Sequence, residues 1–321
     1  MASPPNLLII TGPTGVGKTS AAVRVAEELD GEIISADSRQ VYRGLVIGTA
    51  APGPDLQERV PHHFINEIDP RKAWSAGAFA AQAAERIEDI LSRGRQPIVV
   101  GGSGLYLRAL TEGFFEEPDT DQEERQEVRD RLRERLEEEG LEVLYQELEE
   151  RDPEWADRLE PGDTQRILRG LEVFEIHGTP LSELQEKHEP EPPIEANWCR
   201  VLLERDREDL YERLDQRVEN LLDSGWLGEA RSLQAAGVPS GAPGLTGLGY
   251  DVLFEHLRGA LSLDDAVGTI QQRHRNYAKR QLTWFRNIED AEVIHLEPEE
   301  GGEEAADRIL EVWNEFTATY A

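Results

Sequence analysis

The chain has 321 residues, of which 34 are Lys or Arg and 65 are Asp or Glu, so its formal net charge is −31. Its hydrophobic share of 38% is enough for a sizeable core, which excludes a disordered chain. No apolar run reaches the ~18 residues of a membrane-spanning helix. A single cysteine, Cys199, excludes a disulfide framework and a cysteine-based zinc site. We therefore expect a globular protein of the cytoplasm. A monomer is a separate expectation.

The excess of acid is combined with very few lysines, namely Lys18, Lys72, Lys187 and Lys279. Acidic surfaces stay hydrated in a salt-rich cytoplasm, where repulsion between like charges is screened. A halophilic origin is therefore one hypothesis, and a merely acidic protein is the other. The net charge also argues against nucleic acid as a partner unless basic residues gather locally.

The first third of the chain alternates between apolar strands and helices. Residues 6–11 are a wholly apolar run that predicts a buried strand, and a helix follows over residues 20–29. Residues 32–35 predict a second strand, residues 75–93 a long Ala-rich helix, and residues 97–100 a third strand. Strand–helix–strand units with short connections predict right-handed crossovers and a parallel sheet.

From about residue 112 the sequence becomes highly charged and keeps a helical period. Three helices are predicted there, over residues 122–139, 141–150 and 163–177. Strands resume over residues 198–203 and 290–296, with helices between them over residues 207–222, 225–236, 250–257 and 263–287, a loop over residues 237–249 and an acidic turn over residues 297–304. This order predicts an all-helical module inserted into an α/β core. The expected divisions are residues 1–111, 112–195 and 196–321.

An eight-residue motif lies between the first predicted strand and the first helix. It fits G-x-x-x-x-G-K-[ST] in full and consists of Gly12, Pro13, Thr14, Gly15, Val16, Gly17, Lys18 and Thr19. Its glycines let backbone N–H groups turn toward a phosphate, and the helix start adds the positive end of its dipole. Lys18 brings a charge to the phosphates, and the Thr19 hydroxyl is placed to ligate Mg²⁺. The motif predicts a polyphosphate or diphosphate ligand.

The residues after the second and third strands favour a transferase. Phosphate-loop enzymes that hydrolyse ATP or GTP usually have a strand that ends in Asp, but the strand at residues 97–100 ends in two glycines. The second strand leads instead to Asp37, at the carboxyl edge of the sheet beside the phosphate loop. A carboxylate there can take a proton from an acceptor that faces a phosphorylated donor. The alternatives for Asp37 are a helix N-cap and an indirect contact with Mg²⁺.

Local basic clusters qualify the argument from net charge. Residues 271–287 hold five cations and almost no acid, interleaved with aromatic residues, which suits a nucleic-acid backbone. The alternative is that these arginines pair with acidic neighbours. Residues 165–169 place Arg166 and Arg169 on one helix face.

The paired histidines, His62 and His63, have no third metal ligand at a suitable spacing, and a structural role is favoured for them. Cys199 lies in a predicted buried strand and is assigned to the core.

Six segments together resemble the tRNA dimethylallyltransferase (tRNA isopentenyltransferase) family, of the bacterial type, over nearly the whole chain. They are GPTGVGKT at residues 12–19, SADSRQVYRGLVIGTA at 35–50, PHHFI at 61–65, GGSGLYLRAL at 101–110, DTQRILRGLEV at 163–173 and YAKRQLTWFRN at 277–287. The resemblance implies a P-loop NTPase-like α/β fold, a parallel sheet flanked by helices, with an inserted all-helical module. It implies transfer of a dimethylallyl group from dimethylallyl diphosphate to the N6 amine of the adenosine 3′ of the anticodon. The substrates would be tRNAs that read codons beginning with U, and the product N6-dimethylallyladenosine.

The resemblance also implies roles for individual residues. Asp37 would take the proton of the adenine amine, while Lys18, Mg²⁺ on Thr19 and Arg207 would stabilise the departing diphosphate. The target base would leave the stack of the anticodon stem-loop to reach Asp37. The residues expected to contact tRNA are Asp37, Ser38, Arg39, Gln40, Ser103, Arg125, Gln165, Arg166, Ile167, Leu168, Arg169, Lys279 and Arg280.

Two positions depart from the family pattern, and three other functions stay open. Ala51 stands where lysine is common, and Ser103 stands where threonine is usual. The alternatives are a P-loop small-molecule kinase, a prenyltransferase that acts on free adenylate, and a non-enzymatic RNA-binding module. A kinase would not need the cationic residues 277–287, a mononucleotide would need no helical clamp, and an RNA-binding module would leave the phosphate loop unexplained.

Overall fold

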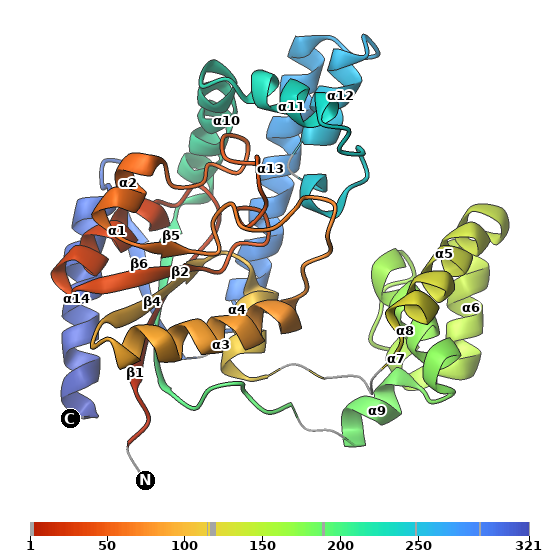
Figure 1. The fold of residues 1–321 in the computed structure, drawn as a ribbon, viewed down its shortest axis with the longest axis horizontal. Helices are drawn as coiled ribbons and strands as arrows, with labels where there is room; N and C mark the ends of the chain where they lie inside the picture. Colours follow the sequence, from red (N-terminus) through yellow and green to blue (C-terminus); the bar gives the residue numbers. More distant parts are fainter. Residues whose placement is uncertain are drawn as a thin grey trace. The chain divides into compact units, whose positions relative to one another are not determined.

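The five strands that the sequence predicts and one short further strand form a single six-stranded sheet (Figure 1). The strands are β1 (Asn6–Thr11), β2 (Gly31–Ser35), β3 (His62–His63), β4 (Gln96–Gly101), β5 (Asn197–Arg205) and β6 (Ala291–Leu296). Their order is β3-β2-β4-β1-β5-β6, and all neighbouring pairs are parallel. The predicted parallel α/β sheet is thus confirmed. This computed structural model describes residues 3–113, 115, 120–187, 190–247, 249–288 and 290–320.

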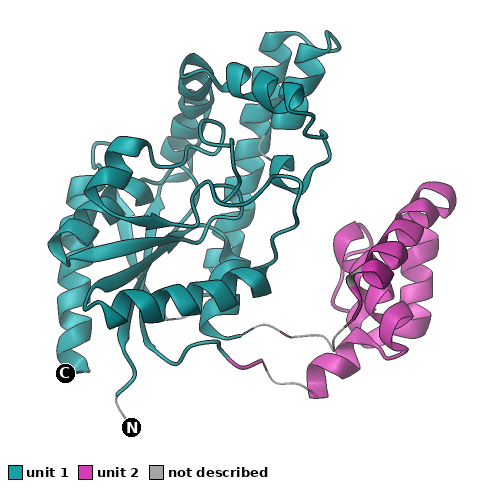
Figure 2. Cartoon of the chain, viewed as in Figure 1, with its two compact units in different colours: residues 1–113, 192–321 teal, residues 114–191 magenta. Residues whose placement is uncertain are grey.

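The chain folds as two compact units, which Figure 2 shows in different colours. Unit 1 contains residues 1–113 and 192–321, and unit 2 contains residues 114–191. Both divisions lie within four residues of those expected from the change in composition. The phosphate loop and Asp37 belong to unit 1, and residues 165–169 belong to unit 2.

The sheet of unit 1 is covered by helices on both faces. Unit 1 as a whole contains the helices α1 (Lys18–Glu28), α2 (Pro54–Arg59), α3 (Ala76–Ser92), α4 (Gly104–Thr111), α10 (Arg207–Asp223), α11 (Trp226–Ala235), the 3-10 helix η1 (Pro243–Leu245), α12 (Tyr250–Leu257), α13 (Leu263–Phe285) and α14 (Gly302–Thr319). Because strand side chains alternate, Leu8 and Ile10 of β1 join one buried cluster with α1 and α14, and Leu7 and Ile9 join another with α3 and α4. None of the described helices is both long and apolar enough to cross a membrane.

Unit 2 is helical throughout the part that the structure describes. Its helices are α5 (Gln122–Glu139), α6 (Leu141–Arg151), α7 (Pro153–Ala156), α8 (Thr164–His177) and α9 (Leu181–Lys187). Leu132, Leu144 and Leu171 lie in its buried cluster. The fully buried Asp152 caps α7 by accepting a hydrogen bond from the backbone N–H of Trp155, and it also accepts one from that of Ser182.

Candidate active site

The phosphate loop joins β1 to α1 at the carboxyl edge of the sheet. Gly12, Gly15 and Gly17 have φ values of 144°, 82° and 115°, in the region that favours glycine. A Cβ on Gly12 would lie only 2.4 Å from the carbonyl oxygen of Leu203. The glycines of the motif are therefore required by the backbone. The loop ends at the N-terminus of α1, where helix geometry favours an anion.

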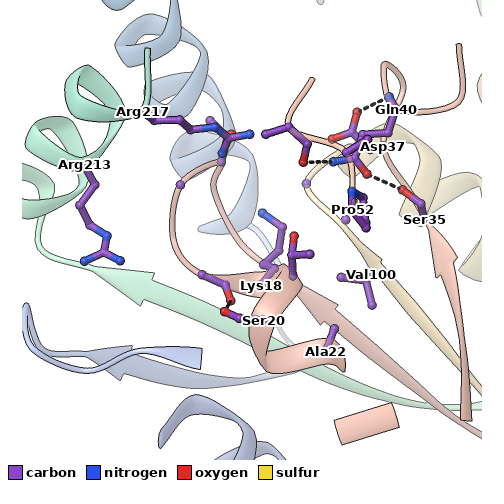
Figure 3. A pocket seen from close by; sticks show the side chains of 18 of the residues that line it. Lys18, Ser20, Ala22, Ser35, Asp37, Gln40, Pro52, Val100, Arg213 and Arg217 are labelled. Atoms are coloured by element: carbon purple, nitrogen blue, oxygen red, sulfur yellow. Dashed lines mark hydrogen bonds between the residues drawn. The ribbon is translucent and has the colours of Figure 1, made fainter. Parts of the chain in front are cut away.

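A cavity of about 680 Å³ opens at this loop. Its walls come from the phosphate loop, the residues after β2, the end of β4, and helices α10 and α13. In Figure 3, Arg213 and Arg217 extend from α10 on one side, Asp37 and Gln40 lie on the other, and Lys18 stands between them. The cavity thus has a cationic wall and a wall that carries a carboxylate.

Lys18 is the central cation of this cavity. Its Nζ donates hydrogen bonds of 2.8 Å to the carbonyl oxygens of Gly12 and Pro13, so it lies against its own loop. Burial lowers the pKa of Lys18 from 10.5 to about 7, an effect that nearby Asp37 opposes and nearby Arg217 reinforces. An anion bound here would stabilise the charged ammonium group and raise its pKa again.

Two arginines of α10 complete the cationic wall. Arg217 donates from Nη1 to Oγ1 of Thr14 at 3.2 Å and from Nη2 to the carbonyl oxygen of Thr49 at 3.4 Å. Burial lowers the pKa of Arg217, and the neighbouring Asp37 opposes the shift. Arg213 lies one helical turn earlier and also lines the cavity.

The structure does not bring Arg207 to the cavity, in contrast to the role expected for it. Arg207 is exposed at the start of α10, where its guanidinium lies 5.0 Å from the centre of the Tyr211 ring. At ~1.5 Å and ~100° per residue, position 207 lies about 15 Å before position 217 along α10 and about 80° away from it around the helix, whereas 213 and 217 are one turn apart on one face. Arg213 and Arg217 therefore occupy the place assigned to Arg207.

Asp37 is oriented by its own turn. Its Oδ1 accepts hydrogen bonds from the backbone N–H groups of Arg39 at 2.8 Å and Gln40 at 3.3 Å. Residues 38–40 form a turn and no helix, so Asp37 is not a helix N-cap. Within the described residues, both of these bonds go to Oδ1, which leaves Oδ2 for a group that enters the cavity.

Ser103 and Tyr277 connect this turn to α13. The Ser103 Oγ accepts a hydrogen bond of 3.1 Å from the backbone N–H of Ser38, and Tyr277 hydrogen-bonds to Ser103. Burial, followed by the charge of Asp37, raises the pKa of Tyr277 to about 12. Tyr277 therefore stays protonated at the edge of the cavity and keeps a hydroxyl donor beside Asp37.

Gln40 and Arg39 tie the same turn to more distant loops. The Gln40 Oε1 accepts a bond of 3.1 Å from the Ser35 hydroxyl, and its Nε2 donates to the carbonyl oxygen of Ala50 at 3.4 Å. Arg39 donates from Nη1 to the carbonyl oxygen of Pro243 at 2.6 Å. Both side chains therefore position the walls of the site.

Gln281 lines the cavity, although no sequence motif predicts it as a site residue. Its Oε1 accepts a bond of 2.9 Å from the backbone N–H of Thr14, and its Nε2 donates to the carbonyl oxygen of Gly102 at 2.8 Å. The side chain is buried, with 6% of its surface exposed. One available signal is its distance of four residues from Tyr277, which places both on one face of α13.

The basic segment on α13 is divided between two roles. Two of its arginines form ion pairs with acidic neighbours, Arg273 with Asp251 and Arg275 with Asp215. Lys279 and Arg280 are exposed, and the Arg280 guanidinium lies 5.7 Å from the centre of the Tyr277 ring. The pairing alternative therefore holds for the first two arginines, while Lys279 and Arg280 remain at the surface near the cavity-lining Tyr277.

Two of the arginines expected to bind tRNA, Arg125 and Arg169, lie beside a buried glutamate in unit 2. Arg169 donates from Nη1 to Oε1 of Glu172 at 2.9 Å, and a guanidinium nitrogen of Arg125 lies 3.8 Å from the same oxygen. Glu172 is 5% exposed. Burial lowers the pKa of Arg169, and Glu172 opposes the shift. Both arginines thus have a structural partner within the unit.

The remaining members of residues 165–169 divide by exposure. Gln165 and Arg166 are exposed, and Arg166 lies 3.6 Å from Asp163, the residue that caps α8. Ile167 is fully buried in the core of unit 2, and Leu168 packs against that core. The Ile167 side chain faces inward on α8, so a contact between Ile167 and tRNA would have to use its backbone.

The histidines and the cysteine have structural surroundings. The Nε2 of His63 lies 2.7 Å from Oε2 of Glu32, and the Nδ1 of His62 lies 2.7 Å from the carbonyl oxygen of Val60. No group of three or more His, Cys, Asp or Glu that could hold a metal occurs among the residues that the structure describes. Cys199 is buried, and burial raises the pKa of its thiol to about 12.

Comparison with known proteins decides the family. The sequence model described as IPP transferase matches residues 40–288. The chain belongs to the IPP transferase family. This IPP transferase is 48% identical to the tRNA dimethylallyltransferase of Salinibacter ruber over 88% of this chain and 86% of that protein. It is 43% identical to the tRNA dimethylallyltransferase of Geobacter metallireducens over 91% and 92% of the two chains.

Solved structures show the same relationship for the fold. The full-length tRNA isopentenylpyrophosphate transferase of Bacillus halodurans matches with a TM-score of 0.70 and 31% identity, over 99% of both chains. A eukaryotic dimethylallyltransferase acting on tRNA matches with a TM-score of 0.76 and 26% identity, over 98% of this chain and 80% of that one. The resemblance inferred from the six segments is confirmed, and with it the prediction of a P-loop NTPase-like fold.

Proposed function

We propose that this IPP transferase moves a dimethylallyl group from dimethylallyl diphosphate to the N6 amine of an adenosine in tRNA and releases diphosphate. The names of its relatives support this reaction. The observation that carries the proposal is the pairing of a phosphate loop and three cations with a carboxylate, Asp37, in one cavity. A phosphate loop without a hydrolytic Asp fits a reaction in which no phosphoryl group moves.

The cationic wall suits the leaving group. As the bond between the allylic carbon and oxygen breaks, positive charge develops on carbon and negative charge on the diphosphate oxygens. The N–H groups of the loop, Lys18, Arg213 and Arg217 all line the place where this negative charge would form. Because hydrogen bonds already hold Lys18 and Arg217 before the reaction, these two cations stabilise the developing charge without rearranging.

Asp37 suits the other half of the reaction. The adenine amine is a weak nucleophile because its lone pair is delocalised, so a base must take its proton as the carbon–nitrogen bond forms. With Oδ1 held by two backbone N–H groups, Oδ2 is the oxygen that receives this proton. The proton passes to Asp37, the dimethylallyl group passes to N6, and the diphosphate leaves with the electron pair of the broken bond.

Mg²⁺ is the proposed metal, and the donor set fits it. Thr19 and Asp37 line the cavity with the oxygen donors that Mg²⁺ prefers. The described residues include no group of three His, Cys, Asp or Glu that could hold a metal alone. The diphosphate and water would therefore supply most ligands, with the Thr19 hydroxyl as the protein ligand. Bound Mg²⁺ would neutralise part of the charge of the leaving diphosphate.

The proposed acceptor is the adenosine 3′ of the anticodon, extruded from the anticodon loop. Support comes from the surface beside the cavity, where Lys279 and Arg280 are exposed, and from the exposed Gln165 and Arg166 of unit 2. At the cavity itself, Ala51 lines the wall and supplies no cation. We also propose that the enzyme acts as a monomer.

A transfer assay tests the proposed reaction. Labelled dimethylallyl diphosphate and Mg²⁺ are incubated with an unmodified anticodon stem-loop, with free AMP as the competing acceptor. We expect label on the stem-loop and none on AMP. Label on AMP alone would assign the chain to prenyltransferases that act on free adenylate. A parallel incubation contains ATP and a small-molecule acceptor, and ATP consumption there without any label transfer would assign the chain to kinases.

The variant Asp37→Asn tests the base. We expect the rate of transfer to fall by about 10²–10⁴-fold, the range that general bases contribute, while diphosphate binding is retained. Asp264→Asn, an exposed aspartate in the first turn of α13, is the matched control and should leave the rate unchanged. An Asp37→Asn enzyme with the normal rate would remove Asp37 from the proposed mechanism.

A further inference from the structure

Part of the phosphate loop has no free N–H group to offer a ligand. Pro13 has no N–H at all, and the N–H of Val16 lies 3.4 Å from the carbonyl oxygen of Pro13 within the loop. The N–H of Thr14 is occupied by Oε1 of Gln281 at 2.9 Å. Among the described residues, the loop N–H groups that remain for phosphates are therefore those of Gly15 and of residues 17–19, next to the start of α1.

Gln281 is held in place from both ends of its amide. While Oε1 accepts from Thr14, Nε2 donates to the carbonyl oxygen of Gly102 at 2.8 Å. The approach is so close that a Cβ on Gly102 would lie 2.4 Å from that nitrogen. Reversing the amide would place a donor against the Thr14 N–H and an acceptor against the Gly102 carbonyl. The oxygen therefore faces the loop permanently.

A phosphate loop that cradles a triphosphate uses successive backbone N–H groups for two of its phosphates, while its lysine reaches on to the third. Here the amide oxygen of Gln281 takes one of these donors and presents a negative dipole end beside it. A third phosphate would lose that donor and approach an acceptor that cannot turn away, which costs binding free energy because a buried charged group is left without its partner. Asp37 lines the same cavity and adds a second repulsive group.

We propose that Gln281 is a specificity-determining residue that limits this loop to ligands with two phosphates. This inference rests on the proposed function, since it takes the diphosphate of the donor as the ligand of the loop. Its consequence is selection against nucleoside triphosphates, which carry the same diphosphate unit and would otherwise compete with the donor. Gln281 discriminates between diphosphates and triphosphates because it occupies the N–H of Thr14 in the loop. It does not need to contact the prenyl group.

The test compares two inorganic probes, pyrophosphate and tripolyphosphate, by calorimetric titration of the full chain with Mg²⁺ in fixed excess. Tripolyphosphate carries more negative charge, so a site governed by charge alone would bind it more tightly. We expect the wild type to prefer pyrophosphate by about tenfold or more. We expect Gln281→Ala to reduce this preference by about fivefold or more, because it frees the Thr14 N–H.

Two further variants make the result decisive. Gln272→Ala, an exposed glutamine on the same helix, is the matched control and should keep the wild-type preference. If Gln281→Ala fails to fold by circular dichroism, Gln281→Met keeps the volume, frees the same N–H and should reduce the preference in the same direction.

Each remaining outcome separates the inference from the proposed function. Equal binding of both probes by the wild type, or an unchanged preference in a folded Gln281 variant, would overturn the inference while leaving dimethylallyl transfer intact. Binding of neither probe, together with no transfer from dimethylallyl diphosphate, would overturn the proposed function and this inference with it.

Discussion

Lys18 has to carry a charge in a buried place where its pKa is about 7. At pH 8 most molecules with an empty site hold this amine neutral, since the pKa lies below the pH. A bound diphosphate favours the charged form and raises the pKa again. We therefore predict that diphosphate binding at pH 8 takes up close to one proton. The measurement is calorimetric titration with pyrophosphate in buffers of different ionisation enthalpy, in which the slope gives the number of protons.

The variant Lys18→Arg separates this proton from those of the ligand. An arginine at position 18 stays charged at pH 8, so the slope should fall by about one proton while an anion can still bind. Any protons that pyrophosphate itself exchanges contribute equally to both titrations. Identical slopes for the two proteins would show that Lys18 is already protonated in the empty site.

At the scale of single residues, the sequence predicts what is local and misses what the fold assembles. The phosphate loop and Asp37 could be assigned because each follows a strand within a few residues. The spacing of Arg213 and Arg217 was available as well, since residues four apart share a helix face. Gln281 could not be placed on the loop, because its partner Thr14 is 267 positions away in the chain and only the packing of α13 joins them.

The loop after β2 depends on one carboxylate of α11. Glu229 accepts hydrogen bonds from the backbone N–H groups of Val46 and Ile47 at 2.8 Å and of Gly48 at 3.0 Å. It also accepts one from the hydroxyl of Tyr250, whose pKa is raised first by burial and then by this carboxylate. Glu229 thus holds residues 46–48, which form no backbone hydrogen bonds of a helix or sheet. Arg217 and Gln40 donate to the carbonyl groups of the two residues that follow this segment.

We predict that Glu229→Ala lowers the free energy of unfolding by about 3 kcal/mol, because several hydrogen bonds to a charged acceptor are lost together. The backbone amides of residues 46–48 should exchange with deuterium faster than in the wild type. A purely global loss of stability would speed exchange throughout the chain and not in this segment alone. The measurements are urea denaturation and hydrogen exchange. Glu311→Ala, an exposed residue of α14, is the control, and equal effects of the two variants would contradict the role given to Glu229.

A second carboxylate joins the elements at the far edge of the sheet. Glu32 of β2 is 2% exposed and is bound by Arg93, by Arg95 at 3.0 Å, and by His63 of β3 at 2.7 Å. The hydrogen bond from Arg93 is the main cause that lowers the pKa of Glu32 from 4.5 to about 2, with His63 contributing and burial opposing. The network therefore stabilises the folded chain only while Glu32 is ionised.

The sign of the pH dependence follows from that lowered pKa. The contribution of Glu32 is fully present above pH 4.5, the unfolded value, and is lost as the pH falls toward about 2. A shift of this size corresponds to roughly 3 kcal/mol. We predict that Glu32→Gln lowers the free energy of unfolding by about this amount at pH 7 and flattens its decline below pH 4.5. Urea denaturation at several pH values measures both, and Glu88→Gln, exposed on α3, should change neither.

Whole elements were predictable where their pattern was long. The helices α5 and α12 begin and end where the hydrophobic period places them, and β1 matches its apolar run. The strand β3 has only two residues, too few for any alternation, and it exists because β2 offers it an edge. The helix α14 begins at Gly302, inside the stretch expected to be an acidic turn, because acidic residues also suit the first turn of a helix.

The charge of the whole molecule is unevenly divided between its two units. Unit 2 holds 27 acidic and 10 basic residues, and unit 1 holds 38 and 24. Unit 2 therefore carries more than half of the net charge of −31 in about a quarter of the residues. Two of its expected RNA-binding arginines, Arg125 and Arg169, also have Glu172 as a partner. The RNA proposed as substrate thus meets a protein that repels it overall.

This imbalance reverses the usual effect of salt on binding to RNA. Most such complexes weaken steadily as salt rises, because cations released from the phosphates are recaptured. Here the repulsion between the acidic protein and the RNA acts over the Debye length, which shortens from about 14 Å to about 4 Å between roughly 0.05 and 0.5 M KCl. Contacts of the RNA with Lys279, Arg280 and Arg166 act at short range, so salt weakens them less over this interval. We predict that the affinity for the anticodon stem-loop rises by about threefold or more over this interval and falls only at higher salt.

Fluorescence anisotropy of a labelled stem-loop across the KCl series measures this dependence. The free energy of unfolding should also rise over the same interval, because salt screens the repulsion between acidic residues within the chain. A charge-neutralised control, in which exposed glutamates of α5 are replaced by glutamine, should bind more tightly at low salt and lose the rising limb. If the affinity of the wild type only falls as salt rises, the local cations outweigh the net negative charge even without screening. RNA binding would then give no support to the halophilic hypothesis. A rising limb that the neutralised variant lacks would show that unit 2 sets the salt range in which the enzyme can bind RNA.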